Sequence, residues 1–150
     1  MSDIMFNFVD GSRPTGYSLA FEPFLYNQEN FLALKNYPVQ SFYAVNHQRR
    51  SVEARIHFVI REQEDGTLRA ISLPELPFGS LEYSRSLTED QISDFLRFVQ
   101  TILAQRHVQS IEIRDCVPAY RTDHSIIYQA LQKSHYHTSE EQVNYHITVN

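Results

Sequence analysis

The fold of this chain is decided by residues 68–106, which read LRAISLPEL (68–76), PFGSLEYSRSL (77–87) and TEDQISDFLRFVQTILAQR (88–106). We interpret the first segment as a strand, the second as a loop punctuated by proline and glycine, and the third as a helix. A strand that runs through a loop into a helix is the first half of a strand–helix–strand unit. The stretch therefore predicts a sheet with helices packed on it.

The helix predicted at 88–106 has a defined start and one apolar face. Thr88 is a favourable N-cap, and Gln91 three residues later completes a capping-box pattern. Its apolar residues recur at spacings of three and four: Ile92, Phe95, Leu96, Val99, Ile102 and Leu103. We expect this face to pack on the sheet, with Phe95 in the core.

Composition and charge exclude several classes of protein. The chain has 150 residues, 42% of them hydrophobic and 21% charged, which suits one domain with a proper core. The formal net charge of −5 argues against non-specific binding of nucleic acid or anionic membranes by this segment alone. The single cysteine excludes an internal disulfide, no apolar run reaches a membrane-spanning length, and the N-terminus lacks a secretion signal. We therefore expect a cytoplasmic protein.

The strand predicted at 52–61 has the clearest alternation in the chain. One face carries Val52, Ala54, Ile56, Phe58 and Ile60, and the other carries Glu53, Arg55, His57 and Arg61. A turn at Asp65-Gly66 predicts a hairpin into a strand at 68–73. Matching periodicities predict one core between this sheet and the helix, made of Ile56, Phe58, Phe95, Val99, Ile111 and Ile113.

The remaining elements complete a mixed sheet. The sequence predicts a helix at 27–36, strands at 41–47 and 110–117, a helix at 123–134 and one terminal strand at 142–149. Phe6 and Phe8 fit a short strand in the otherwise patternless segment 1–23. The order is helix, three strands in a meander, helix, strand, helix and strand.

This order resembles the GNAT acyltransferase fold. The segments SLPELPFGSLEYS (72–84), IEIRDCVPAY (111–120) and VNYHITV (143–149) are similar to the N-terminal GNAT-like half of FemAB-type peptidyltransferases. The resemblance covers 24–149 and implies an α/β (mixed α+β) sheet, an antiparallel meander followed by strand–helix–strand, with helices on both faces. It also implies a single domain over 1–150 that is the first half of a longer two-domain protein.

The sequence departs from the GNAT pattern where acyl-CoA chemistry needs it. GNAT enzymes hold the CoA pyrophosphate on a glycine-rich loop before this helix, whereas residues 81–90 here read LEYSRSLTED, without glycine and with three acidic residues. The GNAT general-acid tyrosine in a pattern close to YxKxGF falls on Leu131. We therefore assign no catalytic residue and no cofactor, and we disfavour acetyl-CoA or another acyl-CoA as a ligand.

Two groups of residues are candidates for substrate binding. The first group lies in the loop before the helix and comprises Phe78, Gly79, Glu82 and Tyr83. This loop is interpreted either as a surface that docks a peptide or a second domain, or as a simple backbone kink. Arg114 and Tyr120 follow a central strand at its carboxyl end, where open α/β sheets bind ligands, although a solvated loop would carry the same residues.

Metal and nucleophile sites are not expected. The seven histidines form no metal-binding motif, and surface or turn positions account for them better. Cys116 has no base fixed beside it by spacing and is better explained as a small buried residue.

Three functions remain open. The first is an acyltransferase-related domain that binds substrate or acts as a scaffold, as in the non-CoA-binding half of a FemAB-like transferase. The second is an interaction module without catalysis, and the third is a divergent acetyl-CoA-dependent N-acetyltransferase. A second GNAT-like domain, or a second copy of the chain, is expected to pair with the unpaired flank of the C-terminal strand.

Overall fold

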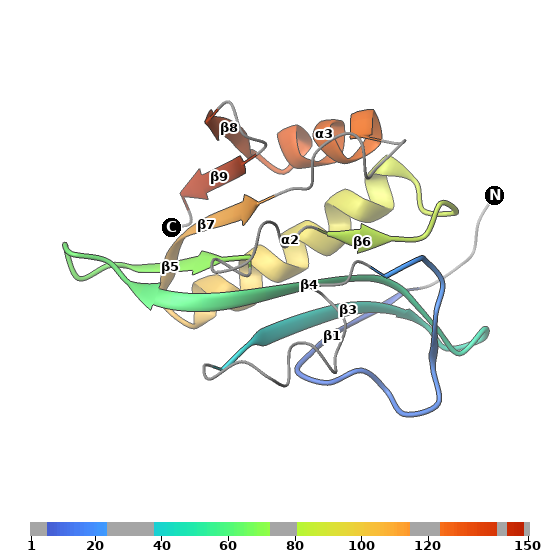
Figure 1. Cartoon of the computed structure of the whole chain (residues 1–150). Helices are drawn as coiled ribbons and strands as arrows, with labels where there is room; N and C mark the ends of the chain where they lie inside the picture. The colour runs from blue at the N-terminus through green and yellow to red at the C-terminus, as the bar shows by residue number, and fades with distance from the viewer. Residues whose placement is uncertain (1–5, 24–37, 73–80, 115–123, 141–143, 149–150) are drawn as a thin grey trace.

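The structure is a computed structural model, and it describes residues 6–23, 38–72, 81–114, 124–140 and 144–148. Its elements form one sheet with helices packed against it (Figure 1). The strands are β1 (Asn7–Asp10), β2 (Ser18–Leu19), β3 (Gln40–Asn46), β4 (Ser51–Glu62), β5 (Leu68–Ile71), β6 (Glu82–Tyr83), β7 (Val108–Arg114), β8 (His137–Glu140) and β9 (Asn144–Thr148). The described helices are α2 (Glu89–Gln105) and α3 (His124–Lys133).

The sheet is mixed, in the order β1-β3-β4-β5-β7-β9-β8, with β2 and β6 paired to β4. Neighbours from β1 to β5 are antiparallel, β5 and β7 are parallel, and β7, β9 and β8 are antiparallel again. Helix α2 makes the crossover between the two parallel strands, as parallel pairing requires. The predicted fold class, a meander followed by a strand–helix–strand unit, is confirmed.

Helix α2 begins as its sequence predicts. The Thr88 hydroxyl accepts from the Gln91 backbone N–H at 3.2 Å, and the Gln91 side chain accepts from the Thr88 N–H at 2.9 Å. The helix then buries its apolar face against the sheet. All six residues of the predicted core lie in one cluster and are at most 1% exposed, so that prediction is confirmed.

Helix α3 ends in a Schellman motif, which explains why the non-glycine residue His135 has a positive φ. The Tyr136 N–H donates to the Leu131 carbonyl, and the His135 N–H donates to the Gln132 carbonyl, both at 2.9 Å. His135 has φ of 72°, the left-handed conformation that this motif requires and that glycine adopts without strain. His107 occupies the corresponding position after α2, with φ of 68°.

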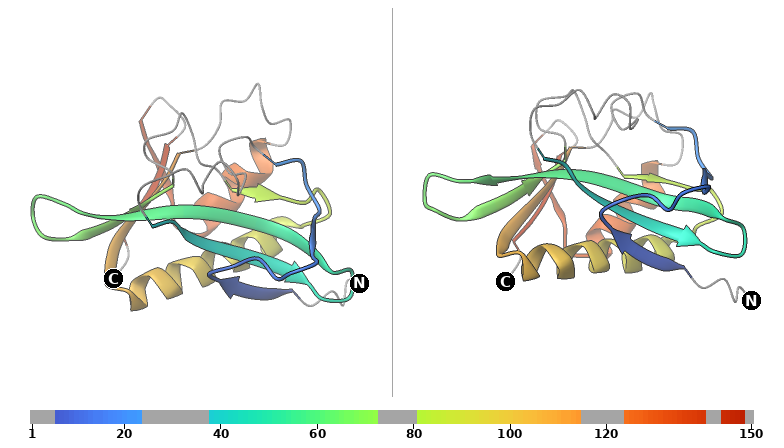
Figure 2. Two further views of the ribbon diagram at one scale, coloured as in Figure 1. Left: turned by 60° about the horizontal axis from the view of Figure 1, so that its bottom comes forward. Right: turned by 90° about the horizontal axis from the view of Figure 1, so that it is seen from below.

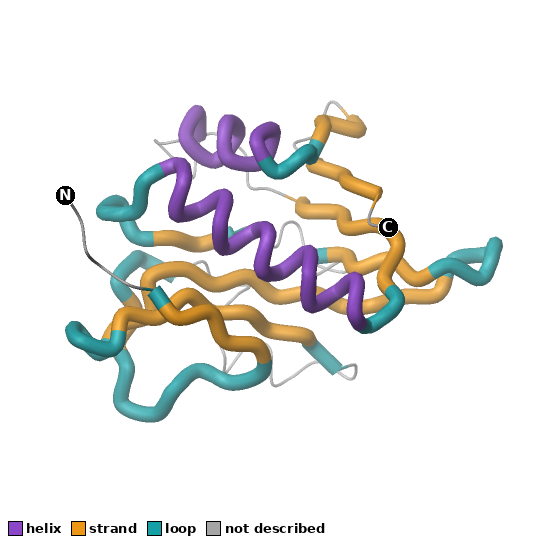
Figure 3. Tube along the Cα trace, turned by 180° about the vertical axis from the view of Figure 1, so that it is seen from behind, coloured by secondary structure: helices purple, strands orange, loops and turns teal. Residues whose placement is uncertain are grey.

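Helices α2 and α3 lie side by side on the same face of the sheet (Figures 2 and 3). The helix expected at 27–36 lies outside the described residues, so the expectation of helices on both faces stays a prediction. Neither described helix is long and apolar enough to cross a membrane.

Two predictions about strands are wrong in detail. Val52 packs with Tyr43 and Val45 in a separate small cluster rather than with Ala54, because a bulge between Ala44 and Val45 shifts the register.

The chain also has two C-terminal strands instead of the one predicted. Strand β9 lies inside the sheet, paired with β7 and β8, so β8 forms the edge. The sequence of β8, HTSE, carries no apolar alternation to reveal it.

Candidate functional site: the polar face of the sheet

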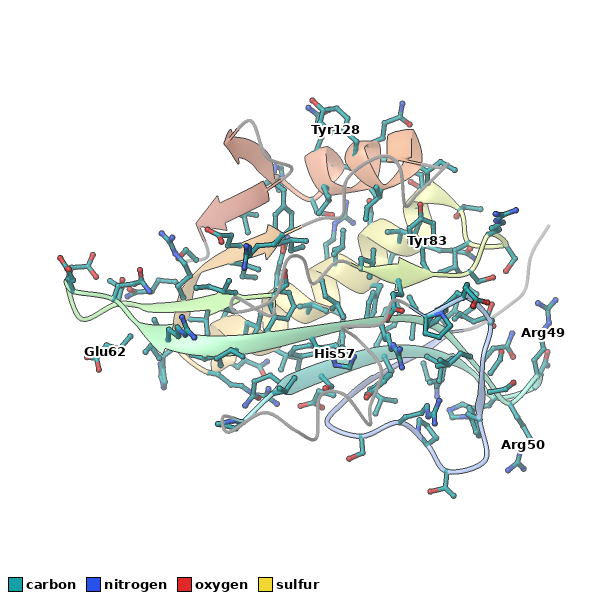
Figure 4. All side chains as sticks on the ribbon, in the orientation of Figure 1. Arg49, Arg50, His57, Glu62, Tyr83 and Tyr128 are labelled. Carbon is teal, nitrogen blue, oxygen red and sulfur yellow. The ribbon has the colours of Figure 1, made fainter. Side chains whose placement is uncertain are left out.

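The face of β4 that points away from α2 carries buried polar side chains. Glu53, Arg55 and His57 are only 1–2% exposed, and they alternate with the apolar residues that contact α2. Burying charged groups is costly unless they are paired and hydrogen-bonded, so a sequence seldom places three in one strand by chance. We take this face as the candidate site (Figure 4).

The centre of the site is an ion pair between two strands. β6 pairs with β4 so that Glu82 lies opposite Arg55, and the Arg55 Nε donates to the Glu82 carboxylate at 2.6 Å. Both side chains are 1% exposed. The Arg55 guanidinium also lies 5.5 Å from the ring centroid of Phe21, in the segment that follows β2. The N-terminal segment thus helps to cover this face.

Glu53 forms hydrogen bonds that hold the segment before α2 against β4. Its carboxylate accepts from the Ser51 hydroxyl at 2.5 Å and from the Ser86 hydroxyl at 3.3 Å. Its backbone carbonyl accepts from the Ser84 N–H at 2.7 Å. Within the described part of the chain, this buried carboxylate is bound by hydroxyl groups and by no cation.

His57 extends the polar face toward β3. The Ser41 hydroxyl lies 2.7 Å from its Nδ1, and the Tyr43 ring meets the imidazole edge-on at 6.2 Å between centroids. Arginine, histidine and two carboxylates are therefore set along one strand and its neighbours. Together they can bind a polar group by charge and by hydrogen bonds.

The hydrogen-bond ladder between the parallel strands β5 and β7 becomes irregular at Ser72. Their ladder ends with the Ser72 N–H donating to the Glu112 carbonyl at 3.0 Å. At the next position the Arg114 N–H donates to the Ser72 hydroxyl at 2.7 Å, so a side chain takes the last hydrogen bond. Ligands of open α/β sheets bind beyond the carboxyl ends of parallel strands.

The N-terminus of α2 is closed by its own residues. The capping box engages the N–H groups of Thr88 and Gln91, and Glu89 and Asp90 lie in the first turn. The Lys133 ammonium of α3 contacts both carboxylates, at 3.5 Å and 2.5 Å. The hydrogen bond from Lys133 lowers the pKa of Asp90 from its usual 3.8.

The structure brings together only part of the predicted substrate-binding set. Glu82 and Tyr83 both lie on β6, but Glu82 faces the polar side whereas Tyr83 belongs to the core cluster. Arg114 ends β7, and its N–H donates to the Ser72 hydroxyl. Phe78, Gly79 and Tyr120 lie outside the described residues, as do Cys116 and the rest of the connection after β7.

Sequence reasoning missed Glu53, Arg55 and His57 as site residues. The alternation of β4 placed them on one polar face, and a polar face usually means solvent. One sequence signal could have shown that this face is buried. The predicted hairpins place β4 between two neighbouring strands, which makes it a central strand. In the described residues, no three histidine, cysteine or acidic side chains gather to hold a metal ion. His47, His107 and His135 are exposed turn residues, and His57 is buried.

The sheet topology matches known structures: a parallel pair, β5 and β7, is joined through α2, and the antiparallel hairpin of β8 and β9 lies beside it. AtaTR bound with AcCoA has a TM-score of 0.55 at 11% identity, covering 96% of this chain and 93% of that one. AtaT complexed with acetyl-methionyl-tRNAfMet has a TM-score of 0.54 at 11% identity, covering 96% and 95%. The fold is that of the GNAT acyltransferases.

A third GNAT-like match is longer than this chain. The cAMP-binding acyltransferase from Mycobacterium smegmatis has a TM-score of 0.54 at 15% identity and aligns over 81% of this chain. This chain spans 34% of the length of that protein. No family model matches the sequence, and no curated protein does. At identities of 11–15% the likeness establishes the GNAT-like fold alone.

Proposed function

We propose that this chain is an acyltransferase-related GNAT-like domain that serves a FemAB-like transferase as its substrate-binding or scaffolding half and does not bind acyl-CoA. The observation that carries the proposal is the closed N-terminus of α2. A phosphate-binding helix offers its first amide groups to the ligand. Here the capping box engages the N–H groups of Thr88 and Gln91, and Glu89 and Asp90 would repel a pyrophosphate.

The connection between β5 and α2 supports the same conclusion. This connection runs from Ser72 to Thr88. The sequence predicts the equivalent of the GNAT pyrophosphate loop at 81–90 only. Its described part is strand and turn: β6 pairs with β4, and Ser84 and Ser86 are bonded to Glu53. Gly79 lies in the undescribed part of this connection.

Substrate binding is proposed for the polar face instead. Glu53 and Glu82 are carboxylates that would attract an amino group, and His57 and Arg55 would orient a polar acceptor beside them. We propose that the substrate approaches from the carboxyl ends of β5 and β7, where the Arg114 N–H donates to the Ser72 hydroxyl. A protein-interaction module would use the same surface without turnover.

Acetyl-CoA titration tests the proposal. We expect no saturable rise in melting temperature, whereas a ligand at about 100 times its Kd would add roughly 2.7 kcal/mol to the stability. The amide resonances of residues 88–92 should stay unchanged in the same titration. Saturable shifts at those amides would contradict the proposal and favour the divergent acetyl-CoA-dependent N-acetyltransferase.

We also propose a partner for the C-terminal end of the sheet, either a second GNAT-like domain or a second copy of the chain. Among the described strands, β8 is paired with β9 alone, so it is the edge to which a partner strand would add. Light scattering over a wide concentration range, with hydrogen exchange of amides 137–140, tests the homodimer. A monomer with fast exchange throughout would rule it out.

A further inference from the structure

A pocket lies beside the loop between β1 and β2, and it adjoins the candidate site through Tyr43, whose ring meets His57. It has a volume of about 450 Å³ and is lined by residues 11–16 and Tyr43. Small-ligand sites in proteins are roughly 300–1,000 Å³, so a small molecule fits. The loop that forms its wall has the sequence GSRPTG, which offers two hydroxyl groups, one guanidinium and several backbone N–H groups.

The loop is held in shape by a turn that needs its glycine. The Tyr17 N–H donates to the Pro14 carbonyl at 3.3 Å, and Gly16 has φ of 82°. This is the geometry of a type II turn, whose third residue is favourable only for glycine. A Cβ on Gly16 would lie 3.0 Å from the Arg50 guanidinium, so Arg50 packs directly on the wall of the pocket.

Arg50 is brought to the loop by the β3–β4 turn. Asn46 Oδ1 accepts from the Arg49 N–H at 3.1 Å, and Arg50 follows with φ of 51°. The Arg50 carbonyl accepts from Ser18, and its guanidinium lies 5.5 Å from the ring centroid of Tyr17. Arg49 and Arg50 are both exposed and leave the turn in different directions (Figure 4).

The charge at this end of the molecule is positive although the chain carries −5 overall. Arg13 lines the pocket, Arg50 lies on its wall, and no carboxylate in the described residues forms an ion pair with Arg50. The nearest acidic residue in the chain, Asp10, is bound by Arg106. Guanidinium groups are suited to a doubly charged oxyanion, and the Ser12 and Thr15 hydroxyls of the lining can add hydrogen bonds.

We propose that this pocket binds the phosphate group of a small phosphorylated ligand, through Arg13, Arg50 and the backbone of residues 11–16. A long polyanion is disfavoured, because the overall charge would repel it and only one turn supplies the positive charge. A carboxylate offers fewer acceptor oxygens and less charge, so acetate is expected to bind more weakly than phosphate.

Inorganic phosphate and glycerol 3-phosphate are the probes, titrated into the 150-residue chain at constant ionic strength while amide resonances are recorded. We expect saturable shifts at Gly11, Ser12, Thr15 and Gly16. Arg13→Gln or Arg50→Gln should weaken the apparent affinity about tenfold, because each removes a charge-assisted hydrogen bond. Arg49→Gln is the matched control; it removes the same charge from the same turn and should change the affinity less than about twofold.

Three outcomes would overturn the proposal. The first is the absence of saturable shifts at residues 11–16 with either probe, in a sample whose spectrum shows that it is folded. The second is an equal loss of affinity in R49Q and R50Q, which would indicate non-specific charge. The third is sedimentation with vesicles that contain phosphatidic acid while glycerol 3-phosphate fails to bind, which would assign the surface to a lipid headgroup.

Discussion

The two faces of β4 are both buried but are built from opposite chemistry. Toward α2 and α3 the strand presents Ala54, Ile56 and Phe58, which join one apolar cluster. Away from the helices it presents Glu53, Arg55 and His57, held by hydroxyl groups and by Glu82. Apolar burial is the main favourable term in folding, whereas a buried ion pair contributes little net stability. The first face therefore stabilises the domain, and the second is retained for another reason, which we take to be binding.

The largest expected effect comes from the apolar face. Phe95→Ala should lower the free energy of unfolding by about 3–5 kcal/mol, because Phe95 is 1% exposed and its removal leaves a cavity. Urea denaturation measures the change. Arg97→Ala on the exposed side of the same helix is the control and should change stability by less than about 0.5 kcal/mol. Similar losses in the two variants would contradict the assignment of the core.

The polar face should respond differently to single and double substitutions. Glu82→Leu or Arg55→Met alone should cost about 3 kcal/mol, because each leaves a buried charge without its partner. The double variant should be more stable than either single variant, since two apolar side chains replace the pair. Urea denaturation of all four proteins closes the cycle. Additive losses would mean that Arg55 and Glu82 act independently, against the geometry of the pair.

Substitutions at the C-terminal ends of α2 and α3 should have a smaller effect on the free energy of unfolding, and of opposite sign. His135→Gly should raise the free energy of unfolding by about 0.5 kcal/mol, since relief of the left-handed backbone outweighs the entropy that glycine gains in the unfolded chain. His107→Gly at the corresponding position of α2 should act in the same direction. Thermal unfolding measures both, and a fall in melting temperature in both variants would be inconsistent with backbone strain.

The smallest effect contrasts an exposed ion pair with the buried one. Lys133 lowers the pKa of Asp90, so the stability that this contact adds is fully present above pH 3.8 and is lost as the pH falls below it. Lys133→Gln should move the Asp90 pKa upward, as should high salt. An NMR titration of the carboxyl groups measures this. The Asp65 pKa, which is lowered by Thr67, is the internal control and should not move in the variant.

The sequence determined most of the fold because the decisive signals are local. The capping box and the 3.6-residue stripe locate α2, the two-residue alternation locates β4, and Asp65-Gly66 joins it to β5. The six-residue core follows from these periods, since matching apolar faces must meet. The resemblance to GNAT acyltransferases was carried by the order of the same elements.

Only the tertiary structure decided that the polar face of β4 is buried and not exposed to solvent. Alternation places Glu53, Arg55 and His57 on one side, but it does not distinguish a solvated face from a buried one. The pairing of β6 with β4, which sets Glu82 against Arg55, joins residues 27 positions apart in sequence. The bulge at Ala44, the inserted strand β9 and the packing of Arg50 on Gly16 are likewise long-range matters of register. Periodicity reports on each element separately, whereas register and burial depend on which elements become neighbours.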